Sequence, residues 1–198
     1  MRRDRKGYVE AGKKERRTMS TYHLDMVFFL CFFVGILWAN LLGDSSRNRF
    51  FMLNEYYLQQ LKYSEIDGNG LLLYILENRL PGLLLMVLLS FTLAGILVQI
   101  LFVGYFGASF GFLCVMAITN FGWKGLVYIG GFLFPHYIFY IIFYLLFLRI
   151  FIKGKEGIST GKKEKMIQAG ILILLLLLGF FSESYVNPVF LKGLIKII

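Results

Sequence analysis

The chain has 198 residues, of which 58% are hydrophobic and only 17% are charged. A typical soluble domain carries about 25% charged and roughly 45–50% apolar residues, so this composition excludes an ordinary soluble domain and indicates a membrane protein. The net charge of +9 does not indicate a nucleic-acid-binding protein. No base-stacking module or base-reading motif accompanies it, and the basic residues flank hydrophobic segments.

The N-terminal part of the chain combines a basic tail with a first hydrophobic segment. Residues 1–23 are polar and basic, so they are expected to form a cytoplasmic tail at the anionic inner leaflet. Residues 24–43 follow with one charge, Asp25, and at ~1.5 Å per residue they match a ~30 Å hydrocarbon core. No small-residue cleavage site follows Trp38, so this segment is predicted to be a retained transmembrane helix.

Residues 44–79 are too polar to span a membrane and are predicted to form an outer, extracytoplasmic segment. The Asp67-Gly68-Asn69-Gly70 sequence is expected to form a turn, with the helix resuming at Leu71. Arg79 is expected to anchor the next span at the interface, with a partner contact as the alternative. A packed helix of an outer domain is the alternative to an interfacial amphipathic helix. The apolar stripe that predicts the helix consists of Phe50, Leu53, Tyr57, Leu58 and Leu61.

The remainder, residues 80–198, is predicted to be a bundle of four further spans. No charged residue occurs from Leu80 to Ile118, and this run is too long for one span. We predict two spans here, roughly residues 81–101 and 105–119. Three small residues mark both the fold between them and a surface for close helix packing, namely Gly104, Gly107 and Gly111.

The predicted fourth span, residues 126–148, is interrupted by Pro135 and His136. Proline bends a helix and frees a backbone carbonyl, and a histidine at membrane depth usually faces protein or a water cavity. The favoured interpretation is structural, with the imidazole bonding to the freed carbonyl or to another span. The alternative is a site for a proton, an ion or a partner.

The C-terminal third contains a second basic segment and the fifth span. Residues 149–165 are predicted to form a cytoplasmic loop and residues 166–181 the fifth span. Residues 182–198 are expected to form a short outer tail in which Pro188 stops the helix. Glu183 is interpreted as a surface carboxylate at the outer end of this span, with a partner contact as the alternative.

The distribution of lysine and arginine predicts the orientation. Eight basic residues precede residue 18, and six lie between Arg149 and Lys165. Basic segments face the cytoplasm, and four spans between the two groups return the chain to the same side. The sequence therefore predicts a multi-pass protein of the cell membrane, with a cytoplasmic N-terminus and an extracytoplasmic C-terminus.

No recognisable catalytic, cofactor-binding or metal-binding pattern occurs in the sequence, so we expect a protein that is not an enzyme and binds neither a cofactor nor a metal. Residues 107–111 match both G-x-S-x-G and G-x-x-x-G. Helix packing is favoured, because a nucleophile elbow requires a strand that a lipid-embedded segment cannot supply. An intramembrane serine protease using Ser109 and His136 is the alternative. Cys31 and Cys114 lie in hydrophobic segments and form no metal-ligand pattern.

Several of these features occur together in one known family. They are the basic N-terminus, the early span, the outer segment ending in Leu76-Glu77-Asn78-Arg79, the pair of spans rich in small residues, Pro135-His136 and the closing Glu183-Ser184-Tyr185-Val186-Asn187-Pro188. In this arrangement the chain resembles the stage II sporulation protein M family of bacterial membrane proteins. Members often carry Pro-His-Gly followed by a glutamate, whereas this chain has Tyr137 and Tyr140.

The resemblance implies a non-enzymatic role in endospore formation. Family members act in the mother-cell membrane during engulfment with the stage II sporulation proteins D and P, which degrade peptidoglycan, and are understood to recruit or position them. We therefore expect a scaffold whose partners are the lipid bilayer and these proteins, and no nucleic acid. The oligomeric state is left open, a homo-oligomer included. A permease or channel-type transporter subunit is the alternative, and the few ionisable residues in the predicted spans argue against it.

Overall fold

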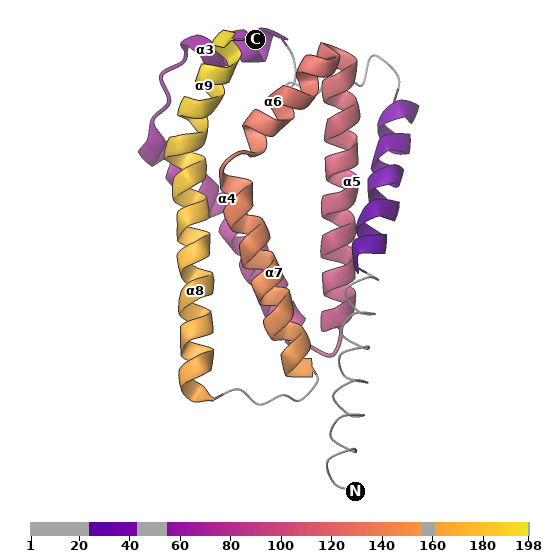
Figure 1. Ribbon diagram of the computed structural model, residues 1–198, viewed down its shortest axis with the longest axis vertical. Helices are drawn as coiled ribbons and strands as arrows, with labels where there is room; N and C mark the ends of the chain where they lie inside the picture. The colour runs from indigo at the N-terminus through magenta and orange to yellow at the C-terminus, as the bar shows by residue number, and fades with distance from the viewer. Residues whose placement is uncertain (1–23, 43–54, 156–160, 198) are drawn as a thin grey trace, which may run out of the picture.

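The computed structural model describes residues 24–42, 55–155 and 161–197, and every regular element in this part of the chain is a helix (Figure 1). Five helices are long and apolar enough to cross a membrane, so the predicted all-α bundle of five spans is confirmed. The helices are, in chain order, the first span Leu24–Leu41, α3 Glu55–Tyr63, α4 Gly68–Ser90, α5 Gly95–Phe121, α6 Trp123–Leu133, α7 His136–Lys155, α8 Lys162–Phe181, the π-helical turn η2 Ser182–Val186 and α9 Asn187–Ile197.

The two ends of the bundle differ in chemistry. Lys155, at the end of α7, donates a hydrogen bond to the Thr92 carbonyl oxygen at 3.0 Å, which brings the α4–α5 turn beside the end of α7. We call this the basic end, because Lys153, Lys155 and Lys162 lie there. Helices α3, α6 and α9 gather at the opposite end, the far end (Figure 1). The spans therefore alternate in direction, as the sequence predicts.

The second span begins earlier than predicted. The Asp67 side chain accepts hydrogen bonds from the backbone N–H groups of Asn69 and Gly70, both at 3.0 Å, and so caps the start of α4. Residues 71–79 consequently belong to a transmembrane helix and not to the interfacial segment, and Arg79 lies inside α4. The helix α3 is present in the outer segment, but Phe50 and Leu53 of the predicted stripe lie outside the described residues.

The turn between the second and third spans lies at residues 91–94 and not at Gly104. The Phe91 and Thr92 backbone N–H groups bond to Leu88 and Leu89, and the Thr92 hydroxyl donates to the Leu89 carbonyl at 2.6 Å. Gly95 opens α5 directly against the Ser90 carbonyl, where a Cβ atom would collide with backbone. The predicted break at Gly104 is therefore wrong, and α5 runs unbroken through it.

The glycines of α5 lie against the first span. A Cβ atom on Gly107 would stand 2.5 Å from the carbonyl oxygen of Phe28, and one on Gly111 would collide with the carbonyl oxygen of Phe32. Both contact pairs advance by four residues, so the first span and α5 run parallel with their backbones in close approach. Gly104 is buried on the same face of α5.

A buried polar network joins α4, α5 and α7. The Gln99 side-chain amide donates to the Ser90 hydroxyl at 2.6 Å, and its carbonyl accepts from the Tyr144 hydroxyl at 2.9 Å. Ser90 in turn donates to the Met86 carbonyl at 2.6 Å. Because these polar groups bond to one another, the network holds the three helices together without leaving one of them without a hydrogen bond in the membrane.

The predicted fourth span is two helices. α6 ends before Phe134 and Pro135, and α7 starts at His136 and extends to Lys155. α7 alone is long enough to cross a membrane. Part of the basic segment that was predicted as a loop is consequently helical, including Arg149.

Pro188 does not stop the last helix. Residues Lys162–Lys196 form one continuous stretch of 35 helical residues, roughly 50 Å long. The Asn187 backbone N–H bonds to the Ser182 carbonyl across the wide η2 turn, and Pro188 follows in the first turn of α9, where proline is tolerated. The predicted outer tail is therefore a helix that continues the fifth span.

Replacing Gly107 should separate the first span from α5. We expect Gly107→Leu to lower the free energy of unfolding in bicelles by about 1–3 kcal/mol, because the new side chain would meet the Phe28 backbone. Gly170→Leu is the matched control, since a Cβ atom at Gly170 meets nothing within 4 Å. Equal losses in the two variants would contradict close packing at Gly107.

Candidate functional site

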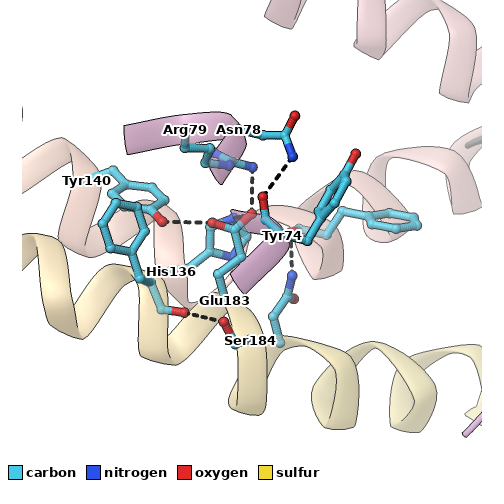
Figure 2. Close-up of polar contacts among 10 residues, drawn as sticks. Tyr74, Asn78, Arg79, His136, Tyr140, Glu183 and Ser184 are labelled. Carbon is cyan, nitrogen blue, oxygen red and sulfur yellow. Dashed lines mark hydrogen bonds and ion pairs between the residues drawn. The ribbon is translucent and has the colours of Figure 1, made fainter. Parts of the chain in front are cut away.

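Four polar side chains from three elements converge inside the bundle. Arg79 comes from α4, His136 and Tyr140 come from α7, and Glu183 comes from η2 (Figure 2). We call these four residues the charge cluster. Ionisable side chains inside membrane-spanning helices are costly and usually functional, so this cluster is the first place to look for a role.

The cluster lies well within the apolar length of the last helix. Glu183 follows Lys165 by 18 residues and precedes Lys192 by 9 residues, which at ~1.5 Å per residue places it ~27 Å from the first lysine and ~13 Å from the second. With a ~30 Å hydrocarbon core, the cluster occupies the half of the membrane nearer the far end.

Both oxygens of the Glu183 carboxylate are occupied. Arg79 Nη2 lies 2.6 Å from Oε1, and the Tyr140 hydroxyl donates to Oε2 at 2.7 Å (Figure 2). The Arg79 guanidinium also lies over the Tyr140 ring, 5.6 Å from its centroid. The Glu183 side chain is 12% exposed and the Arg79 side chain 41% exposed. Arg79 is therefore the more exposed member of the pair.

His136 stands beside this pair without bonding to it. Its side chain is 2% exposed, and Nε2 lies 3.9 Å from Glu183 Oε1, beyond hydrogen-bond distance. Nδ1 is buried and has no hydrogen-bond partner. The rings of Tyr137 and Tyr140 meet the imidazole edge-on, with centroids 5.0 and 5.8 Å away. A buried imidazole nitrogen without a partner is uncommon and calls for an explanation.

Local sequence explains how Tyr140 reaches the carboxylate. Gly179 of α8 lies directly under the tyrosine ring, and a Cβ atom there would stand 2.5 Å from Cε1 of Tyr140. The π-helical turn η2 follows at once and carries Glu183. Wide turns of this kind interrupt long helices and are frequent at functional sites.

Neighbouring hydrogen bonds hold the elements around the cluster. Asn187 donates to the Phe132 carbonyl at 3.1 Å, which satisfies a backbone group freed where α6 ends. The Tyr185 hydroxyl donates to the side-chain oxygen of Asn69 in the first turn of α4. Gly68 permits this contact, because a Cβ atom there would overlap the Tyr185 ring. The start of α4 and the end of α6 are thus both hydrogen-bonded to the last helix.

The structure places several predicted residues differently from the sequence. Arg79, expected at the interface, is inside α4, and Glu183, expected on the surface, is buried against it. His136 does not bond to the carbonyl freed at Pro135, because its Nδ1 has no partner and Nε2 faces Glu183. His136 makes ring contacts with Tyr137 and Tyr140 and lies 3.9 Å from Glu183.

Tyr140 is the cluster member that the sequence reasoning did not select. In the sequence it stands out only as a departure from the sporulation family at this position. Its spacing of four residues from His136 places both on one face of a helix, and this was the signal that could have identified it.

No family model, curated protein or solved structure matches this chain. Among the described residues, no group of three or more histidine, cysteine, aspartate or glutamate side chains could hold a metal ion. The proposals below are consequently argued from the residues and their geometry, together with the resemblance in the sequence motifs.

Removing the Tyr140 hydroxyl should weaken the cluster. We expect Tyr140→Phe to lower the free energy of unfolding in bicelles by about 1–2 kcal/mol, because Glu183 Oε2 loses its buried donor. Tyr74→Phe serves as the control, since Tyr74 is 64% exposed on α4. A Tyr140→Phe protein as stable as its parent would show that the bond contributes nothing.

Proposed function

We propose that this chain is a non-enzymatic integral membrane scaffold of endospore formation, which recruits or positions peptidoglycan-degrading partners during engulfment. The sporulation proteins D and P of stage II are the partners that the sequence resemblance implies. The five membrane-spanning helices support the membrane location, and the motifs at residues 76–79 and 183–188 support the family.

One observation carries the scaffold proposal, namely that the far end is built as an ordered cap. α3 packs on α9, and Lys192 of α9 donates a hydrogen bond to the Ser64 carbonyl just after α3. Tyr63 and Trp123, at 81% and 85% exposure, are large aromatic residues open at this end. Aromatic side chains of this kind suit contact with a partner protein or with the membrane interface.

We further propose that the basic end faces the cytoplasm and the cap faces the wall. Lys153, Lys155, Lys162 and Lys163 lie at one end, and short basic segments are retained on the cytoplasmic side. In this orientation α3, α6 and the C-terminus lie on the side where peptidoglycan is found.

A reporter enzyme that works only outside the membrane tests this orientation. Inserted at residue 158 it should be inactive, and fused after residue 198 it should be active. The reciprocal cytoplasmic reporter supplies the control. Activity of the external reporter at residue 158 would reverse the proposed orientation and remove the cap from the wall side.

Disturbing the cap should impair partner localisation without removing the protein from the membrane. In a spore-forming host that depends on this chain, Lys192→Ala should misplace a fluorescent peptidoglycan-degrading partner and delay engulfment, because α3 loses its bond to α9. Lys196→Ala, one turn further along the same helix and exposed, is the matched control. Normal engulfment after deletion of the whole gene would end the scaffold proposal.

A permease or channel-type subunit is the second candidate, and the charge cluster is the observation that favours it. The sequence argument against transport was the scarcity of ionisable residues in the spans. Arg79 and Glu183 now lie inside spanning helices, and paired charges at this depth are typical of substrate or ion pathways. Solute or ion flux into proteoliposomes that contain the purified chain, lost in Glu183→Gln, would favour transport over the scaffold.

A further inference from the structure

The charge cluster contains one group that neither proposed function uses. His136 is 2% exposed, and its Nδ1 is buried without a hydrogen-bond partner. A phenylalanine or leucine would fill the same space without burying a polar nitrogen, so packing alone does not explain an imidazole here. The ring thus has one nitrogen without a partner, Nδ1, and another, Nε2, that faces the Glu183 carboxylate, and a neutral imidazole can take up a proton.

The His136 ring and the Arg79 guanidinium face the same carboxylate oxygen. Arg79 Nη2 lies 2.6 Å from Glu183 Oε1, and His136 Nε2 lies 3.9 Å from that atom. An unprotonated imidazole at 3.9 Å makes no hydrogen bond. An imidazolium would donate a charge-assisted bond to Oε1, for which a shift of about 1 Å suffices.

We propose that His136 and Glu183 form a proton-binding site in which the imidazole takes up a proton and then competes with Arg79 for the Glu183 carboxylate. Arg79 is the member that leaves, because its side chain is 41% exposed whereas that of Glu183 is 12% exposed. Proton uptake would thus transfer the ion pair from α4 to α7. The site stands independently of the scaffold and transport proposals.

The two charged groups that face His136 act on an imidazolium in opposite senses. Arg79 from α4 repels its charge, and Glu183 from η2 attracts it. From its own helix, Tyr137 and Tyr140 enclose the ring. Glu183 is the one negative charge in this set, so it is the one group here with which an imidazolium can form an ion pair.

The exchange should weaken the contact between the last helix and the half of α4 nearer the far end. Arg79 supplies the charged contact between α4 and η2, and the remaining contact described above is the neutral hydrogen bond of Tyr185 with Asn69. A spin-label pair at Leu73→Cys on α4 and Val189→Cys on α9 would report the movement, since both positions are exposed. The labels are placed in the full chain with Cys31→Ser and Cys114→Ser, in nanodiscs of neutral phosphatidylcholine. The pH is varied, and the distance between the labels is measured.

Acidification from about pH 8 to about pH 4 should reversibly lengthen or broaden the distance distribution of the parent. The response should be absent in His136→Gln and present in Tyr144→Phe, a control on the same helix that bonds Gln99 instead of the cluster. A parent that does not respond, or a His136→Gln variant that responds like the parent, would overturn the proposal.

A second measurement reads the proton directly and does not depend on the histidine variant folding. The chain has two histidines, so His23→Gln leaves His136 as the only signal in ¹⁵N-histidine NMR. An imidazolium signal should appear over the same pH range, and Glu183→Gln should move the midpoint down by about one pH unit or more, a tenfold weaker proton affinity. A ring that stays neutral throughout, or a midpoint unchanged in Glu183→Gln, would also overturn it.

Discussion

Opposite charges that lie inside a hydrocarbon layer have to remain in contact, and here they are Arg79 of α4 and Glu183 of η2, 2.6 Å apart. Leaving either charge alone at this depth would cost far more than the pair does. The requirement fixes how α4 crosses the last helix. It also brings α7 alongside, because Tyr140 supplies the donor for the second carboxylate oxygen.

The irregular backbone of the bundle is found next to this pair. The break at Phe134–Pro135 comes directly before His136, and the π-helical turn η2 carries Glu183. Irregular backbone at membrane depth is tolerated only where protein satisfies its polar groups. Asn187 does so for both features, through its side-chain bond to Phe132 and its backbone bond to Ser182. The two interruptions therefore form one structural unit around the charges.

Sequence reasoning predicted the five spans because hydropathy is a property of each segment alone. It misplaced the turn of residues 91–94, since Phe-Thr-Leu-Ala holds no glycine or proline, whereas the glycines that suggested a turn serve packing. It placed the start of the second span at the uncharged run that begins at Leu80 and so set Arg79 at the interface, whereas Asp67 caps a helix that already includes Arg79. Arg79 and Glu183 are 104 positions apart in the chain, and no local pattern predicts a contact over that separation.

The ion pair is the central claim, and a double-mutant cycle tests it most directly. The free energy of unfolding in bicelles would be measured for the parent, Arg79→Gln, Glu183→Gln and the double variant. A paired arrangement predicts that the two single losses are strongly non-additive, with a coupling energy of about 1 kcal/mol or more. Losses that simply add, giving a coupling energy of about zero, would contradict the pairing of these two charges and with it the organisation of the bundle.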